Sequence, residues 1–398
     1  SSELDEVTNE SHLNATIKNL VVQDFIPYLF TNPDVKGKIS GVVKITDPLG
    51  KATINFNGKV DSLLLENKYI GNVNASANAN TEDGKVSFAA DNIDSTNIFT
   101  LNGFYNYKDS INNSIDVNLE GQKIQLSILE PYLADIFSKI DGIGISHLKI
   151  SGNNKHQYLT GTVNVNNAAL KVDFTQCRYF LENQEIKFEN DLINLDMISV
   201  KDSLNNSATL NGKISHQFFD NIRFDNINLE TGKISLLNTT KSNNNQFYGN
   251  IIGKAKLNIN GPLENLKLNI DGEPSLLDSS HIYLNTSDSK EISSIDYIDF
   301  VPFGEKMEDF KNKFKNNILV NLNINANPSC KVDVILDEET GDIIKGQGNG
   351  LINVKVGNIE PLSIRGTYNI TKGDYTFNFQ TFLKKPFTLN RGDRKSVV

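Results

Sequence analysis

The feature that most constrains the fold of this chain is an alternation of apolar and polar residues with a period of two. Runs such as Leu266–Ile270 and Tyr375–Phe379 place every second side chain on the same side of an extended strand. One face of each strand is then apolar, and the other carries Asn, Lys or Thr. This pattern is typical of antiparallel sheets that leave one face in water. We therefore predict an all-β fold, built as a long antiparallel meander.

Turn-forming residues support this prediction. The chain has 55 asparagines and 27 glycines, and both residue types tolerate the positive φ angles of tight turns. The Asn-Gly pairs at 57–58, 102–103, 211–212 and 260–261 are therefore predicted to form hairpin turns.

Helices are expected at only two places. Apolar residues recur at helical spacing from Pro131 to Ile140 and from Glu305 to Asn317. We interpret both as short helices that cap openings of the sheet. A helix that contacts a membrane surface or a partner is the alternative.

A longer repeat, with a spacing of about 105 residues, overlies the alternation. Gly37–Ile45 matches Gly142–Ile150 and Gly249–Ile259, while Val22–Leu29 matches Ile124–Leu133. We predict stacked multi-strand blocks at 1–115, 116–225 and 226–325, the third with the helix near 305–317, followed by a β region at 326–392. Residues 393–398 look like a translated sequencing adaptor, so we set them aside and interpret the chain as an internal fragment.

Composition and motifs argue against catalysis and against nucleic-acid binding. The net charge is −9 and the pI is about 5.2, whereas a nucleic-acid binder needs a basic surface. Two cysteines cannot frame a disulfide scaffold, and the five histidines lack metal-ligand spacing. Gly346–Gly350 leads into a strand and indicates a bulge, while Asp337–Asp342 indicates a hairpin tip. We therefore predict no catalytic residue, no metal, no cofactor and no enzyme activity.

The apolar strand faces pose a problem of coverage. Too few helices are predicted to cover a large sheet, and no apolar stretch approaches the roughly 18 residues that span a bilayer. The sheet must pack on a second sheet, close as a barrel or curl. A long meander of blocks favours curling into an open hydrophobic groove, and an acyl chain suits such a lining. The candidate groove-lining residues are Ile54, Phe56, Val163, Val165, Leu257, Ile259, Leu266, Leu268, Ile270, Leu322, Ile324, Ile352, Val354, Tyr375, Phe377 and Phe379.

The segment from Val332 to Gly392 resembles the C-terminal region of the TamB family of translocation and assembly module subunits, within the larger AsmA-like group. The resemblance runs through the motifs Val334–Asp337, Thr340–Gly346, Gly348–Gly350, Gly366–Ile370, Lys372–Phe377 and Phe387–Leu389. Upstream, the repeats resemble those of the family only in style.

The resemblance implies a curled, β-taco-like groove in the periplasm of a Gram-negative cell, with an inner-membrane anchor on a missing N-terminal helix. It further implies that phospholipid acyl chains move along the groove to the outer membrane, with a TamA- or BamA-type β-barrel as a partner. Two alternatives stay open. One is a scaffold for outer-membrane protein assembly or for secretion of autotransporter-like clients, which should offer free strand edges. The other is an adhesin-like extracellular β repeat, whose apolar faces should be sealed.

Overall fold

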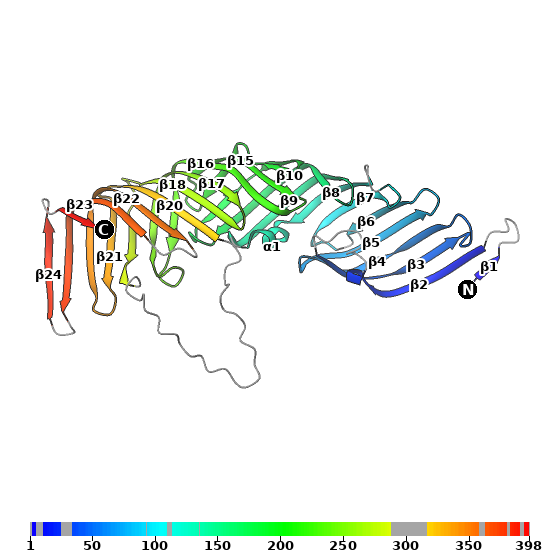
Figure 1. Cartoon of the computed structure of the whole chain (residues 1–398), viewed down its shortest axis with the longest axis horizontal. Helices are drawn as coiled ribbons and strands as arrows, with labels where there is room; N and C mark the ends of the chain where they lie inside the picture. The colour runs from blue at the N-terminus through cyan, green and yellow to red at the C-terminus, as the bar shows by residue number, and fades with distance from the viewer. Residues whose placement is uncertain are drawn as a thin grey trace, which may run out of the picture.

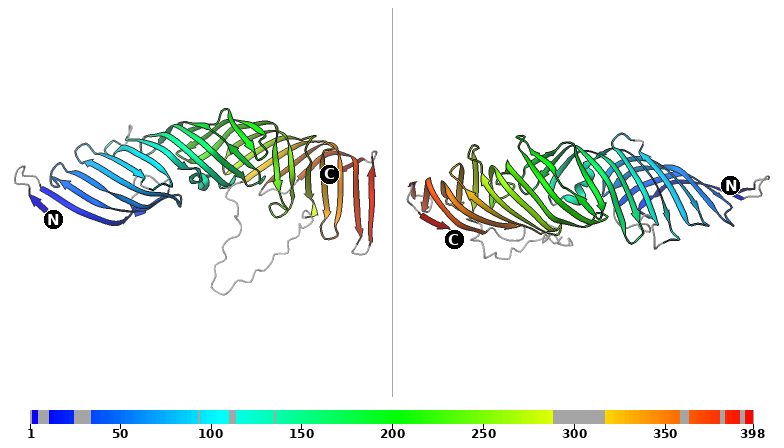
Figure 2. Two further views of the ribbon diagram at one scale, coloured as in Figure 1. Left: turned by 180° about the vertical axis from the view of Figure 1, so that it is seen from behind. Right: turned by 90° about the horizontal axis from the view of Figure 1, so that it is seen from above.

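The computed structural model describes residues 2–4, 11–24, 34–92, 94–109, 114–134, 136–287, 317–357, 363–379, 383–390 and 394–397. Strands make up 76% of the structure and helices 4%, which confirms the all-β prediction. In this part of the chain, 25 strands join into one sheet. The sheet is long and curved, with β1 at one end and β24 at the other (Figures 1 and 2).

The strands follow one another along the sheet largely in chain order. The first eight are β1 (Ser2–Leu4), β2 (Ser11–Val21), β3 (Val35–Thr46), β4 (Thr53–Leu65), β5 (Lys68–Asn80), β6 (Lys85–Asn92), β7 (Ile98–Asn106) and β8 (Ile115–Gln125). The next eight are β9 (Phe137–Gly152), β10 (Gln157–Val172), β11 (Arg178–Leu181), β12 (Gln184–Asn190), β13 (Leu192–Asn194), β14 (Ile198–Asp202), β15 (Ser207–Gln217) and β16 (Asp220–Thr239). The last nine are β17 (Phe247–Pro262), β18 (Asn265–Pro274), β19 (Ser280–Asn285), β20 (Asn317–Ala326), β21 (Cys330–Asp337), β22 (Asp342–Gly357), β23 (Ser363–Phe379), β24 (Leu383–Asn390) and β25 (Arg394–Val397).

Most neighbouring strands are antiparallel, as predicted, but two pairs are parallel. β18 pairs with β20 from Asn265↔Asn317 onward, and β19 pairs with β21 from Ser280↔Cys330 onward. A parallel pair needs a long crossover connection, and the chain between β19 and β20 supplies one. The meander is therefore interrupted once, and β22 returns antiparallel to both β20 and β21.

β-bulges and strand breaks cross the sheet from strand to strand. A bulge inserts an extra residue, which bends the strand and increases its twist. The collinear strands β18 and β19 both pair with β17, and β20 and β21 both pair with β22. The break between two collinear strands bends the sheet in the same way as a bulge. Because the irregularities lie in neighbouring strands, they let the whole sheet curl. Register shifts occur at Ile17/Leu20, Lys36/Lys38, Val60/Leu63, Gly121/Ile124, Asn166/Ala169 and Thr231/Ile234.

The predicted Asn-Gly hairpin turns are wrong. The pairs at 57–58, 102–103, 211–212 and 260–261 all lie within strands, namely β4, β7, β15 and β17. Gly58 faces Gly41 across the β3–β4 ladder, and the ring of Phe56 lies against both. A Cβ atom on Gly58 would lie 2.3 Å from the carbonyl oxygen of Ser40. Glycine is needed here for close packing on a bent strand, not for a turn.

The first predicted helix is also wrong in its extent. α1 spans only Glu130–Leu133, after the 3₁₀-helix η3 (Leu126–Leu129), and β9 already begins at Phe137. The second, at 305–317, lies outside the described residues except for Asn317, which begins β20. A 3₁₀-helix that the sequence did not predict, η1 (Val22–Asp24), follows β2 within the repeated segment Val22–Leu29.

The three repeated segments all form strands. Gly37–Ile45 lies in β3, Gly142–Ile150 in β9 and Gly249–Ile259 in β17. The block boundaries at 115/116, 225/226 and 325/326 stay predictions, and the strands β8, β16 and β20 run through them. Arg394–Val397, in the segment set aside as an adaptor, pairs with β23.

Candidate functional site

The strand register gathers the alternating apolar residues on one face of the sheet, which we call the inner face. In β17, β18, β20 and β22, a row of directly paired residues crosses this face, and a second row lies beside it. The first row is Leu257, Ile270, Leu322 and Val354, and the second is Ile259, Leu268, Val320 and Val356. In the N-terminal strands β3 to β6 an equivalent row is Val43, Phe56, Ala77 and Phe88.

The inner face of the C-terminal strands is closed. Leu266 and Val320 are each 2% exposed, and both belong to buried clusters. The turn after β10 adds Phe174, whose ring lies 5.5 Å from that of Phe247 on β17. Tyr179 on β11 donates a 2.8 Å hydrogen bond to the carbonyl of Ser235 on β16. The curled sheet thus packs this part of its inner face against its own middle strands. We call the stretch from β11 to β22 the closed region.

The inner face of the N-terminal strands is open. Ala77 on β5 and Phe88 on β6 are only half-buried, and no buried cluster of the described chain contains them. Leu13 and Leu20 on β2 are 40% and 41% exposed. A small cluster around Val60 closes only one end of these strands. We call this stretch, from β2 to β8, the open stretch.

The predicted groove-lining residues divide between these environments. Val165, Leu266 and Val354 are buried. Val163 packs beside the cluster around Ile140, and the following pack beside the C-terminal clusters: Ile259, Leu268, Ile270 and Leu322. Among the described residues, these predicted positions are half-buried and belong to no buried cluster: Ile54, Phe56, Leu257, Ile324, Ile352, Tyr375 and Phe377. Whether any of them lines a lipid groove stays a prediction.

The aromatic run in β23 keeps the predicted register. Tyr375 pairs with Ile344 and Phe387, and its ring stacks on that of Phe387 with centroids 5.9 Å apart. Phe377 lies on the same face, while the side chain of Phe379 lies outside the described part. Asn378 lies on the opposite face, yet it is only 9% exposed because it is next to the β21–β22 hairpin tip at Gly341.

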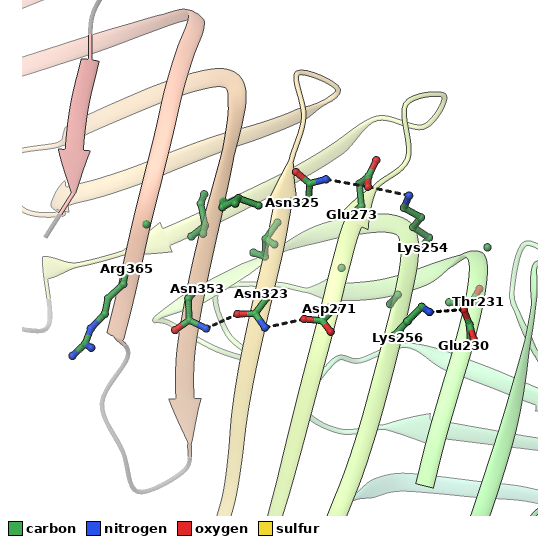
Figure 3. Close-up of a pocket in the computed structure, with 17 residues that line it drawn as sticks. Glu230, Thr231, Lys254, Lys256, Asp271, Glu273, Asn323, Asn325, Asn353 and Arg365 are labelled. Atoms are coloured by element: carbon green, nitrogen blue, oxygen red, sulfur yellow. Dashed lines mark hydrogen bonds and ion pairs between the residues drawn. The ribbon is translucent and has the colours of Figure 1, made fainter. Parts of the chain in front are cut away.

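The outer face carries a hollow of about 950 Å³ between two rows of exposed side chains (Figure 3). Its charges neutralise one another, since Lys254 pairs with Glu273 at 3.0 Å and Lys256 with Glu230 at 2.9 Å. Asn323 donates to Asp271 at 2.8 Å, along the parallel β18–β20 pair. Because these polar groups already pair with one another, they form a ladder that stabilises the sheet. We therefore assign no ligand to the hollow.

One buried carboxylate, that of Asp202 at the end of β14, is held by several hydrogen bonds. The carboxylate of Asp202, 1% exposed, accepts hydrogen bonds from three backbone N–H groups and from the amide of Asn206. Burial acts to raise the pKa of Asp202, but these donors outweigh it and hold the pKa below its usual value. One donor is the N–H of Ser235, at 2.8 Å, so the carboxylate ties the β14–β15 turn to β16.

The sequence prediction missed much of the open stretch. The alternation Val86, Phe88, Ala90 was a usable signal for an inner face on β6, but small residues such as Ala77 weaken the apolar contrast. The sequence marked Ile124–Leu133 as a repeat and predicted a helix from Pro131, but it did not predict that Leu126 packs with Ile140 and Val165. No helix among the described residues is long and apolar enough to cross a bilayer.

Comparison with known proteins places this architecture in a family. The family model described as the TamB C-terminal domain matches residues 196–395, from just before β14 into β25. No match was found among curated proteins or among solved structures. The match covers half of the chain and extends the resemblance of the C-terminal motifs upstream through β14. The chain therefore belongs to the TamB family, whose members act in transport or assembly at the outer membrane of the Gram-negative envelope.

Proposed function

We propose that this chain carries phospholipid acyl chains along its inner face in the periplasm, by binding and without catalysis. The observation that carries the proposal is the open stretch, where apolar side chains lie on the inner face with no layer of the described chain over them. A monomeric soluble protein rarely exposes a contiguous apolar surface unless that surface binds something. Each methylene of an acyl chain that leaves water for this face gains about 0.8 kcal/mol.

The dimensions of the open stretch suit acyl chains. Neighbouring strands are about 4.8 Å apart, so the six steps from β2 to β8 span roughly 29 Å. The hydrocarbon core of a bilayer, which is two acyl chains deep, is about 30 Å thick. The open stretch is therefore long enough for two chains end to end, or for one chain in motion. The polar outer face keeps the rest of the sheet in water.

The alternative functions fit less well. An assembly scaffold should offer an unprotected strand edge to a client. Of the two edges of the described sheet, the one at β24 carries Lys384, Lys385 and Pro386, residues that protect an edge from strand addition, whereas β2 is covered by β1 only at Ser11–Leu13. An adhesin-like repeat should bury its inner face throughout, in contrast to the exposed Leu13 and Leu20. For the full-length protein, we further propose an outer-membrane β-barrel partner and an inner-membrane anchor.

The test is a charge on the open face. Phe88→Asp should keep the fold, because water reaches the new carboxylate, but it should weaken binding of a fluorescent phospholipid at least about tenfold through lost apolar contact. Ser87→Asp, on the outer face of the same strand, is the matched control and should bind normally. Unchanged lipid binding by a folded Phe88→Asp protein would contradict the proposal, as would a detergent-free preparation that takes up no phospholipid from vesicles.

A further inference from the structure

The hairpin between β15 and β16 ends in a turn made of two phenylalanines. Gln217 pairs with Asp220, so Phe218 and Phe219 form the whole connection. Their φ angles are +49° and +67°. Two-residue loops with both φ angles positive are normally formed by asparagine and glycine, because large side chains are strained at such angles. Aromatic residues in this turn therefore need contacts that hold them in place.

The second phenylalanine of the turn has two such contacts. The backbone N–H of Phe219 donates a 3.3 Å hydrogen bond to Nδ1 of His216, and the two rings stack with centroids 5.4 Å apart. On its other side, the ring of Phe219 lies 5.7 Å from that of Tyr132 in α1. The turn is thus held by a histidine of its own hairpin and by a tyrosine from a distant part of the chain.

His216 lies in surroundings that suit only its neutral form. It is 3% exposed. Because Nδ1 accepts a hydrogen bond, the neutral ring carries its proton on Nε2, and this atom has no hydrogen-bond partner among the described residues. Ile214, two residues earlier on the same side of the strand, packs beside the buried cluster around Phe224.

One charged group acts on His216 from the connection between β12 and β13. Burial lowers the pKa of His216, and the carboxylate of Asp191, which acts to raise it, does not outweigh burial. The backbone carbonyl of Asp191 accepts a 2.8 Å hydrogen bond from the N–H of His216. Its carboxylate is already paired with Nε2 of His156 at 3.0 Å. Asp191 is therefore shared between the two histidines.

The titratable groups of the other neighbouring elements are neutral or paired. Burial and the nearby carboxylate of Glu66 raise the pKa of Tyr132, so its hydroxyl carries no charge. On β16, Arg223 pairs with Asp225 at 3.0 Å. A proton on His216 would therefore be compensated by Asp191 alone, and only in competition with His156.

We propose that His216 is an acid-sensitive latch for the β15–β16 turn, which is released from His216 and Tyr132 when Nδ1 takes up a proton. Protonated Nδ1 is a donor, and it would face the N–H of Phe219, which is also a donor, so this hydrogen bond is lost. The new charge is buried in apolar surroundings, which favours an arrangement that exposes it. This inference does not depend on the proposed lipid function.

The direction of the pH dependence follows from the lowered pKa. An exposed histidine has a pKa of about 6.5, and the pKa of His216 in the latched turn is lower. Above about pH 6.5 both forms are neutral and the latch has its full strength. As the pH falls from that value through the pKa of the latched form, the released form binds more protons and the latch weakens.

The experiment is hydrogen exchange of the full chain, followed by mass spectrometry at about pH 7.5 and about pH 5 and corrected for the intrinsic effect of pH on exchange. Protection of residues 216–221 in the unmodified protein should fall about fivefold or more at the lower pH, as expected from the loss of one hydrogen bond. Protection of residues 53–65, in β4, should not change.

Three variants identify the group that responds to acid. His216→Asn keeps an acceptor, because the side-chain oxygen of asparagine takes the place of Nδ1, but it cannot be protonated. Its protection should be the same at both pH values. His147→Asn, at the exposed ion pair with Glu120, is the matched control and should keep the response. His156→Asn, at the other histidine beside Asp191, should keep it too.

The latch can be refuted with or without a folded variant. Equal protection of residues 216–221 at both pH values in the unmodified protein would overturn it. A response that persists in folded His216→Asn, or that disappears in His156→Asn, would also overturn it. In the unmodified protein, the NMR signals of the His216 ring, assigned through its contact with Phe219, should titrate below about pH 6.5, and a midpoint at or above that value would contradict the latch.

Discussion

The inner face of β2–β8 and the inner face of β17–β22 are built from the same alternation, yet one is open and the other is closed. Leu13 on β2 is 40% exposed, whereas Leu266 on β18 is 2% exposed. The strands of both regions share the period of two, although small residues such as Ala77 lie on the open face, so the pattern alone does not account for the difference. The difference comes from connections that return to the sheet, such as the turn that carries Phe174, and from the curl that brings β11 against β16. Strand pattern decides which residues face inward, and the connections decide whether they meet water.

The largest expected effect is that of a charge in the closed region. Leu268 packs between the two C-terminal clusters, so Leu268→Asp should bury a carboxylate without a partner and cost about 4 kcal/mol or more of unfolding free energy. Urea unfolding followed by circular dichroism measures this cost. Lys267→Asp, on the exposed outer face of β18, is the control and should leave the unfolding free energy unchanged. A native-like transition for Leu268→Asp would mean that water reaches this face and that the two regions do not differ.

Removing the same side chain from both regions sharpens the comparison. Leu266→Ala leaves a cavity in a packed cluster and should lower the unfolding free energy by about 2–4 kcal/mol. Leu13→Ala, at a position already 40% exposed, should cost about 1 kcal/mol or less. Thermal melts of the two variants, run without lipid, test whether Leu266→Ala costs more stability than Leu13→Ala. Similar losses would show that another part of the molecule covers β2 in solution.

Part of the fold was accessible from the sequence. Period-two alternation at Leu266–Ile270 and Tyr375–Phe379 predicted the strands and their inner faces, because the contrast between faces fixes the register. The same rules mistook Asn57-Gly58 for a turn. There, glycine serves the close approach to Gly41, which depends on a strand about 17 residues away. The carboxyl-rich Asp337–Asp342 tip was predicted as a hairpin, and this prediction is confirmed.

Open and closed stretches could not be told apart from the sequence, for the same physical reason. The contacts of Tyr132 with Phe219 and of Asp202 with Ser235 join segments that no local pattern relates. Helical spacing from Pro131 to Ile140 predicted one helix. The chain instead forms a single helical turn and then β9, because pairing with β10 satisfies the backbone from Phe137 onward.

Acidification should loosen the closed region before the open stretch. The folded pKa of Asp202 lies below the unfolded value of about 3.9, so its stabilisation is complete above that value and is lost as the pH falls through the folded pKa. Hydrogen exchange at pH 3 should therefore rise first in β14–β16. Asp202→Asn should remove about 1–3 kcal/mol at pH 7 and flatten this pH dependence. Exchange that rises first in β3–β6 would contradict the assignment.

The smallest expected effect, and the same in both regions, is that of an outer-face ion pair. Lys256 pairs with Glu230 over the closed region, and Lys51 pairs with Glu82 beside the open stretch, with all four side chains more than half exposed. The Glu230 carboxylate raises the pKa of Lys256, but solvent and salt screen such pairs. Lys256→Met and Lys51→Met should each leave the thermal transition unchanged within error. A loss for Lys256→Met alone would mean that the polar ladder on β16–β23 acts cooperatively and that the closed region is held from its outer face as well as its inner one.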